Sequence, residues 1–285
     1  MPTKPLKQYT TVLTIAGSDG SGGAGIQADL KTFAALGCYG LSVVTDITAQ
    51  NTCGVFDSIA LPAEFVARQI RVLADDIHID AIKIGMVSSP ETIRAIAETL
   101  RNTLDAPLVL DTVLASSSGT PLSSGDSKKA LLEELLPLAD LVTPNIPETA
   151  DLTGTSPLPS RRTDIERMAD ILRKKGASAV LIKGGHTTGQ SCDDYLLSST
   201  FGEWLSGPKI ETPNTHGTGC TLSSAIAAGL AKGLGLQQAV KNAKEFTSEA
   251  LRSGAGFNLG KGAGPLHHLY ALPGEESPLG KRPIE

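Results

Sequence analysis

The sequence predicts an α/β fold with three layers, α/β/α, built on a mostly parallel central sheet. Short apolar runs rich in β-branched residues alternate along the chain with longer amphipathic runs. Repeated strand–helix units of this kind give parallel strands joined by right-handed crossovers, with helices on both faces. With 285 residues, the chain is long enough to bury roughly 75% of its unfolded surface without a disulfide or a metal.

Short, β-branched apolar runs bounded by turn residues predict the strands. These strands are residues 11–16, 41–47, 81–84, 108–110, 141–143 and 179–182. The amphipathic runs between them predict helices at residues 25–36, 62–74, 90–104, 127–135 and 164–175. The helix at 62–74 is the clearest, because Val66, Ile70 and their neighbours follow helical spacing and Pro62 suits a first turn.

The alternation of predicted strands and helices is interrupted after residue 194. Residues 195–197 and 203–205 flank a segment with a glycine turn, which predicts an antiparallel hairpin at the edge of the sheet. Helices are expected at 222–231 and 236–251. We expect one domain over residues 11–270, with flexible termini at 1–10 and 273–285, the second rich in proline, glycine and charge.

Composition excludes several classes of partner. The net charge is −5 and no run of lysine or arginine occurs, which argues against nucleic acid and anionic membranes. No apolar run approaches the roughly 20 residues that span a bilayer, and the first residues lack a signal-peptide core. The four cysteines form no metal-binding spacing, so we expect reduced thiols in a cytoplasmic protein.

The segment from Asn214 to Gly229 is the most informative part of the chain. Gly217 and Gly219 bracket Thr218 just before an alanine-rich helical run. Glycine lets the backbone fold so that N–H groups converge on an anion, and the helix start adds free donors and a positive dipole end. Cys220 stands at this helix start, where its pKa is expected to fall. The pattern indicates phosphoryl transfer; the alternative is a glycine-rich turn that only starts a packed helix.

A polar or glycine-rich segment follows each predicted strand. In an open parallel sheet these strand ends share one edge, where ligands bind. The sequence therefore predicts one small-molecule site along that edge. The segments are residues 17–20, 48–52, 85–86, 111–113, 144–148 and 183–186.

The glycines of residues 20–25 also match the dinucleotide fingerprint G-x-G-x-x-G, with Asp46 near the spacing of a ribose contact. Three residues separate the strand end from the first glycine, although the fingerprint turn follows its strand directly. That interpretation also leaves Lys183 and the later glycine loop without a task. No Lys-Ser/Thr pair follows the glycines, so the loop is not a Walker A motif either. We expect residues 20–25 to enclose a small substrate, with Asp29 close enough to contribute.

Taken together, the motifs resemble the hydroxymethylpyrimidine/phosphomethylpyrimidine kinase family of thiamine biosynthesis, in the ribokinase-like superfamily. The resemblance runs in order from about residue 12 to His268, and the pair His267–His268 is interpreted as C-terminal packing. The motifs that carry it are AGSD at 16–19, SGGAGIQAD at 21–29, AQNT at 49–52, KIGM at 83–86, LDTV at 110–113, TPN at 143–145, KGGH at 183–186 and HGTGC at 216–220.

The resemblance implies a ribokinase-like fold and a cytoplasmic kinase dependent on ATP and Mg²⁺. Such an enzyme phosphorylates 4-amino-5-hydroxymethyl-2-methylpyrimidine and then its monophosphate. Members of this family are similar in being dimeric, which implies a homodimer.

The resemblance also implies roles for individual residues. Gly217, Thr218 and Gly219 would form an anion hole for the transferred group. Cys220 matches the position of the catalytic base; the alternative is that it only contacts substrate while the proton leaves with phosphate. Gln50 would pair with the amine and a ring nitrogen of the pyrimidine.

The remaining family positions surround the same site. Gly17, Asp29, Met86 and Val113 would line the substrate pocket.

Two carboxylates and two ATP-side residues complete the implied site. Asp111 and Glu148 would approach Mg²⁺, although Glu148 is also explained as a first-turn helix charge. Lys183 and Asn145 would lie near ATP; the alternative for Lys183 is an exposed lysine at a strand end.

Three other functions remain open from the sequence. A pyridoxal or pyridoxine kinase of the same superfamily shares these motifs, but Gln50 favours the aminopyrimidine because a pyridoxal ring has no amine. The first glycine loop allows an NAD(P)-binding oxidoreductase. A silent pyrimidine sensor is disfavoured, since Cys220, Lys183 and the anion loop are all present.

Overall fold

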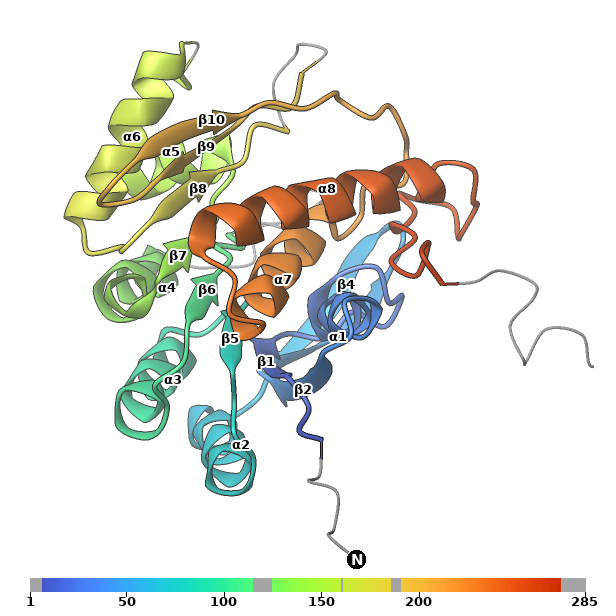
Figure 1. The fold of residues 1–285 in the computed structure, drawn as a ribbon. Helices are drawn as coiled ribbons and strands as arrows, with labels where there is room; N and C mark the ends of the chain where they lie inside the picture. The colour runs from blue at the N-terminus through green and yellow to red at the C-terminus, as the bar shows by residue number, and fades with distance from the viewer. Residues whose placement is uncertain (1–6, 115–124, 160, 186–190, 273–285) are drawn as a thin grey trace, which may run out of the picture.

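The computed structural model describes residues 7–114, 125–159, 161–185 and 191–272. Within these residues, one eight-stranded sheet has the order β10-β9-β8-β7-β6-β5-β1-β2, and a separate two-stranded sheet pairs β3 with β4 (Figure 1). The strands are β1 (Thr11–Ala16), β2 (Tyr39–Val44), β3 (Asp46–Asn51), β4 (Gly54–Ala60), β5 (Ala81–Ile84), β6 (Leu108–Leu110), β7 (Leu141–Val142), β8 (Val180–Ile182), β9 (Asp194–Leu197) and β10 (Gly202–Leu205).

Strand directions confirm the predicted sheet. The pairs from β2 through β1, β5, β6 and β7 to β8 are parallel, whereas β8–β9 and β9–β10 are antiparallel. The parallel strand ends therefore meet at one edge of the sheet, as expected for this architecture.

Helices cover both faces of the large sheet. The helices α1, α7 and α8 lie on one face, and α2 to α6 lie on the other (Figure 1). Their bounds are α1 (Gly25–Ala35), α2 (Ala63–Asp76), α3 (Pro90–Thr103), α4 (Gly125–Ala130), α5 (Ile146–Thr153), α6 (Arg162–Lys174), α7 (Thr218–Ala231) and α8 (Leu236–Gly254).

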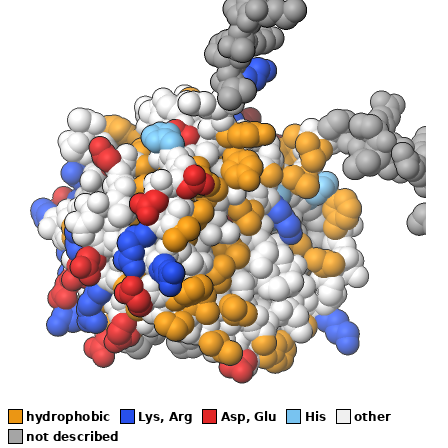
Figure 2. All heavy atoms as spheres, turned by 90° about the horizontal axis from the view of Figure 1, so that it is seen from below, with side chains coloured by type: hydrophobic (Ala, Val, Ile, Leu, Met, Phe, Trp, Pro, Cys, Tyr) orange, Lys and Arg blue, Asp and Glu red, His pale blue; other side chains and the backbone are white. Residues whose placement is uncertain are grey.

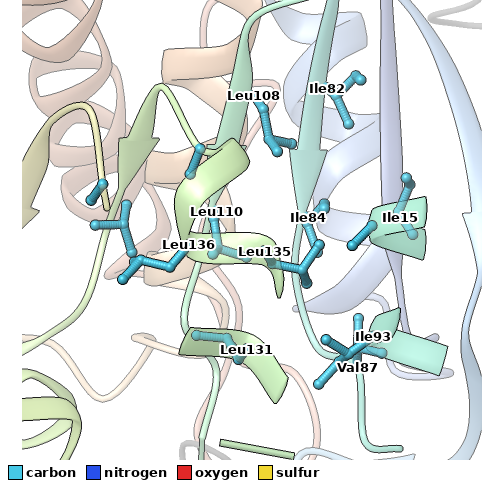
Figure 3. Packing of buried hydrophobic residues seen from close by; sticks show 14 of the residues in the cluster. Ile15, Ile82, Ile84, Val87, Ile93, Leu108, Leu110, Leu131, Leu135 and Leu136 are labelled. Atoms are coloured by element: carbon cyan, nitrogen blue, oxygen red, sulfur yellow. The ribbon is translucent and has the colours of Figure 1, made fainter. Parts of the chain in front are cut away.

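Strand alternation produces two hydrophobic cores. Successive side chains point to opposite faces, so Leu13 and Ile15 join the core under α2–α6 while Val12 joins the core under α7 and α8. Figure 3 shows the first core, where Ile82 and Ile84 lie on one strand beside Leu108 and Leu110 on the next.

The structure corrects three predictions of elements. The strand predicted at 41–47 ends at Val44, and the chain then starts β3, which belongs to the small sheet. Residues 48–52, interpreted as a loop after a strand of the main sheet, mostly form β3 itself. The helix predicted at 127–135 is shorter, because α4 passes at Leu131 into one π-helical turn (Leu131–Leu135) and then a 3₁₀ turn (Leu136–Leu138).

One further helix, α5, was missed by the sequence pattern. It has only eight residues, begins at a capping box between Asn145 and Glu148, and ends at Gly154 in the left-handed region with φ 70°. Residues 1–6 of the predicted flexible terminus 1–10 lie outside the described residues, as do the predicted segment 273–285 and His186 of the sixth strand-end segment. In the part of the chain that is described, no helix has the length and apolar character needed to cross a membrane.

Candidate active site

The glycine loop at the start of α7, residues 217–219, is called here the glycine turn or anion turn, and it has the tight backbone that its sequence predicts. Gly217 caps the helix in the left-handed region with φ 85°, and α7 begins at Thr218. A side chain at Gly217 would place its Cβ 1.8 Å from the carbonyl oxygen of Gly23, so only glycine fits here. The first N–H groups of α7 have no acceptor within the helix, which makes this turn a donor site for an anion.

The first glycine loop, residues 20–25, packs against this turn. The Asp19 carboxylate accepts hydrogen bonds from the N–H groups of Ser21, Gly23 and Ala24 at 2.8–3.1 Å. Burial would raise the pKa of Asp19, but these bonds and the one from His216 outweigh it and hold the pKa well below its usual range. The loop therefore closes around a side chain of the protein itself.

This arrangement removes the dinucleotide alternative. Asp46, the residue at the spacing of a ribose contact, is 1% exposed and accepts a hydrogen bond from Ser88. The Ser18 N–H donates to the Asp46 carbonyl at 2.8 Å, so the segment after β1 packs against the start of β3, and the Asp46 side chain is engaged within the protein.

Cys220 lies in the first turn of α7, but its acidity is opposite to the prediction. Burial, joined by the charges of Asp29 and Asp111, raises the pKa of the thiol to about 11, although Lys83 and the Gly25 N–H act in the opposite direction. The helix dipole favours a thiolate, yet removal of water from the sulfur has the larger effect. The expected fall in pKa is therefore wrong: in the free protein Cys220 is a neutral thiol at pH 7.

A buried ion pair lies beneath the same turn. Lys83 Nζ contacts Asp29 Oδ1 and Oδ2 at 3.0 and 2.9 Å, and both side chains are 0% exposed. Burial would lower the pKa of Lys83, but the charge of Asp29 outweighs it and raises the pKa. Asp29 also accepts from Thr14 Oγ1 at 2.6 Å and Ser224 Oγ at 2.7 Å. Asp29 was predicted to line the substrate pocket, whereas here its oxygens bond to protein groups.

A second ion pair lies on the other side of the glycine turn. Lys183 Nζ is 2.7 Å from Asp111 Oδ1, which also accepts from Thr143 Oγ1 at 2.9 Å. The positive charge of Lys183 outweighs the effect of burial, so the pKa of Asp111 is lowered. A Cβ at Gly219 would lie 3.3 Å from Lys183 Nζ and 3.6 Å from Asp111 Oδ2. The structure therefore brings the lysine predicted near ATP to the glycine turn.

Glu148 and Asn145 serve as a helix cap. Asn145 Oδ1 accepts from the Glu148 N–H at 2.8 Å, and Glu148 Oε2 accepts from the Asn145 N–H at 2.8 Å. Thr112 Oγ1 lies 3.4 Å from the same carboxylate. Burial raises the pKa of Glu148, and so does the nearby negative charge of Asp111, although Lys183 lowers it. Glu148 is thus a first-turn residue of α5 and also lies near Asp111.

Gln50 lies at an irregularity of β3. The register of β3 and β4 shifts between Ala49 and Gln50, a feature that re-aims a side chain. Gln50 Nε2 lies 3.4 Å from His216 Nε2, which in turn lies 2.8 Å from Asp19 Oδ2. A histidine next to the anion turn therefore connects the predicted pyrimidine contact to the first glycine loop.

The other predicted pocket residues fall into two places. The Gly17 N–H donates to the Met86 carbonyl at 3.2 Å, and a Cβ at Gly17 would lie 2.5 Å from Met86 Cε. Val113 is half-buried and follows Asp111, to whose carbonyl its N–H donates at 3.0 Å.

Three residues of this region were not among the predicted site residues: Asp19, Lys83 and His216. A signal for Lys83 was present, because a lysine between Ile82 and Ile84 in a buried strand needs a partner of opposite charge. Which acid supplies that partner depends on how α1 packs on the sheet.

Comparison with known proteins shows which family the chain is similar to. Residues 19–267 match the family model described as phosphomethylpyrimidine kinase. The hydroxymethylpyrimidine/phosphomethylpyrimidine kinase of Rhizobium meliloti is 49% identical over 258 residues, covering 90% of this chain and 96% of the relative.

Two solved structures are also similar. A phosphomethylpyrimidine kinase from Clostridium difficile has a TM-score of 0.75 at 44% identity and covers 85% of this chain and 99% of its own. The ADP complex of Bacillus subtilis pyridoxal kinase has a TM-score of 0.84 at 34% identity, over 92% of this chain and 98% of its own.

Proposed function

This chain belongs to the phosphomethylpyrimidine kinase family, and we propose that it transfers a phosphoryl group from ATP to the hydroxymethyl group of 4-amino-5-hydroxymethyl-2-methylpyrimidine. It then phosphorylates the monophosphate to the diphosphate, in thiamine diphosphate biosynthesis. The observation that carries the proposal is the glycine turn at the start of α7, which has Cys220 within it and Lys183 beside it.

Transfer at this turn depends mainly on placing donors where charge develops. The N–H groups of Gly217 and Gly219 bind the oxygens of the transferred group, and their preorganisation stabilises the transition state. The Thr218 N–H donates to the Thr215 carbonyl at 3.2 Å in the free protein, so its proposed contact to the transferred group replaces that bond. Lys183 adds a positive charge close to Gly219, where it balances the polyphosphate. The side-chain oxygen of Asn145 is used as a helix cap, so its proposed contact to ATP uses its NH₂ group.

Cys220 is the proposed proton acceptor. As the substrate oxygen forms its bond to phosphorus, its proton passes to the sulfur. Because the thiol pKa is raised to about 11, this step requires the minor thiolate form, whose basicity is correspondingly high. The positive charge of Lys83 lowers the pKa of the thiol and so favours the thiolate form.

Gln50 is the proposed specificity contact. Its amide offers an acceptor and two donors, which match the amine and a ring nitrogen of an aminopyrimidine. Gly17, Met86 and Val113 are proposed as pocket walls, and Asp29 acts on the site from beneath through its bonds to Lys83 and Ser224.

The residues also fit a magnesium ion. No group of three or more His, Cys, Asp or Glu side chains is arranged for a metal within the described residues. Asp111 and Glu148, however, are close enough for their charges to repel, and Thr112 adds a hydroxyl oxygen. Mg²⁺ favours such oxygen ligands and keeps several waters, so these residues would hold it against the ATP phosphates and it would neutralise phosphate charge.

We further propose that the protein is a cytoplasmic homodimer that binds neither nucleic acid nor membranes. All four cysteines are free, as reduced thiols would be. The exposed apolar side chains Ile47, Phe56 and Ile59 of β3 and β4 support pairing with a second copy. Figure 2 shows that hydrophobic side chains gather in a band on the face seen from below. Sedimentation equilibrium tests this, and a monomer at micromolar concentration would contradict it.

One assay tests the activity. Purified protein is given Mg-ATP with the pyrimidine alcohol, with pyridoxal or with pyridoxine, and phosphorylated products are separated and counted. Mono- and diphosphates of the pyrimidine are expected. The similarity to the pyridoxal kinase structure makes pyridoxal the second candidate, and a large preference for it would replace the proposed substrate.

A further inference from the structure

The hairpin of β3 and β4, called here the recognition hairpin, stands outside the large sheet. Its strands pair with each other, and Ile47, Phe56 and Ile59 are each more than half exposed. A two-stranded hairpin is marginally stable on its own, so its position needs support from other segments. Thr48 supplies one support near the middle, where its hydroxyl donates to the Ser18 carbonyl at 2.8 Å.

The turn of the recognition hairpin is supported by a segment from the far end of the chain. Residues 257–268, called here the C-terminal strap, follow α8 and contact the hairpin (Figure 1). Thr52 Oγ1 accepts from the N–H groups of Lys261 at 3.2 Å and Gly262 at 3.1 Å.

The strap and the hairpin turn lie so close together that two positions of the strap have no room for a side chain. A Cβ at Gly260 would lie 2.2 Å from Thr52 Oγ1, and one at Gly262 would lie 1.9 Å from the Thr52 carbonyl oxygen. Gly260 also has φ 74°, a region that disfavours side chains. The strap therefore carries glycine at the two positions where Thr52 fits against it.

The other end of the strap is bonded to the anion turn. The His216 N–H donates to the Gly264 carbonyl at 3.0 Å, and a Cβ at Gly264 would lie 2.0 Å from Asn214 Oδ1. Further along, His268 Nε2 lies 2.9 Å from Thr221 Oγ1 within α7, and both side chains are buried. One strap thus contacts the segment of Gln50 and the segment of Cys220.

These contacts close a ring. Gln50 lies beside His216, His216 is bonded to the strap, and the strap returns to Thr52, two residues after Gln50. We propose that the C-terminal strap sets the distance between the recognition hairpin and the anion turn, with Thr52 as a positioning residue for Gln50. The inference rests on the proposed function for its substrate, but the anchoring itself does not.

The test compares three variants. Thr52→Val removes the acceptor and keeps the shape, Thr52→Ser restores a hydroxyl, and Ser58→Ala is the matched control on the same hairpin, away from the strap. Loss of these bonds corresponds to roughly 1 kcal/mol, or about fivefold. For Thr52→Val we expect a KM for the pyrimidine raised about fivefold, an unchanged KM for ATP and a melting temperature lowered by no more than about 4 °C. Thr52→Ser and Ser58→Ala should behave as wild type.

Hydrogen exchange of the backbone amides in residues 46–60 tests whether Thr52 anchors the hairpin, independently of whether the anchoring affects pyrimidine binding. In Thr52→Val without substrate, these amides should exchange about fivefold faster, while β1 and β5 keep their rates. Unchanged exchange, or a KM for the pyrimidine equal to that of wild type, overturns the strap proposal. A wild-type protein that phosphorylates no pyrimidine alcohol overturns the proposed function instead, and the exchange rates still decide whether Thr52 anchors the hairpin.

Discussion

The raised pKa of Cys220 gives a sharp prediction for the pH dependence of the reaction. If the sulfur accepts the substrate proton, only the thiolate is active in the free enzyme. With a pKa of about 11, the thiolate amounts to about 0.01% of the protein at pH 7 and about 1% at pH 9. Because the fraction of Cys220 in the thiolate form rises about tenfold per pH unit below the pKa, kcat/KM should increase by the same factor.

The perturbation is Cys220→Ala, and the activity of this variant is measured beside wild type from pH 7.5 to 9.5. General-base catalysis contributes about 10²–10⁴-fold, so Cys220→Ala should lose that much kcat and show a flat pH profile. Its affinity for ATP should stay almost unchanged, because the side chain is assigned to the alcohol and not to the nucleotide.

The assay is steady-state ADP release with the pyrimidine alcohol at each pH, with ATP affinity measured separately by titration. The fluorescence of Trp204, the single tryptophan, checks that the protein remains folded at each pH. A wild-type profile that is flat over this range, or full activity in Cys220→Ala, would refute the base role and leave Cys220 as a substrate contact.

Three further outcomes follow from the structure. Lys83→Met leaves Asp29 buried without its cation, so urea unfolding should show a loss of roughly 3–5 kcal/mol, and a loss below about 1 kcal/mol would argue against an important ion pair. Gln50→Ala should weaken pyrimidine binding by roughly 1–3 kcal/mol in a titration while ATP binding is unchanged; equal pyrimidine affinity would remove it from recognition. Gly217→Ala puts a Cβ 1.8 Å from the Gly23 carbonyl oxygen, so phosphoryl transfer should be lost, and an active variant would show that the turn tolerates rearrangement.

Local sequence patterns predicted most of the fold because their information is short in range. The strands Thr11–Ala16, Ala81–Ile84 and Leu108–Leu110 have the predicted bounds, and the edge hairpin of β9 and β10 is antiparallel as expected. The recognition hairpin was missed because the apolar pattern of residues 41–47 continues past Val44. Nothing in that pattern shows that the chain leaves one sheet for another at Thr45.

Local sequence also predicted one part of the candidate site and not another. Glycine spacing and the helical run after residue 217 indicated an anion turn, since the conformational freedom of glycine is a property of the residue itself. By contrast, the acidity of Cys220 was predicted with the wrong sign. The helix start is local, whereas the burial and the neighbouring charges of Asp29 and Asp111 come from other segments.

The sequence by itself determined the layered α/β architecture, the glycine turn and the residues at the strand ends, because periodicity, turn chemistry and residue type act over a few positions. Only the tertiary structure decided that Asp29 pairs with Lys83, that Asp111 pairs with Lys183, and that the strap meets Thr52. Each of these contacts joins residues more than 50 positions apart, and their energies depend on distances and burial that exist only once the chain has folded.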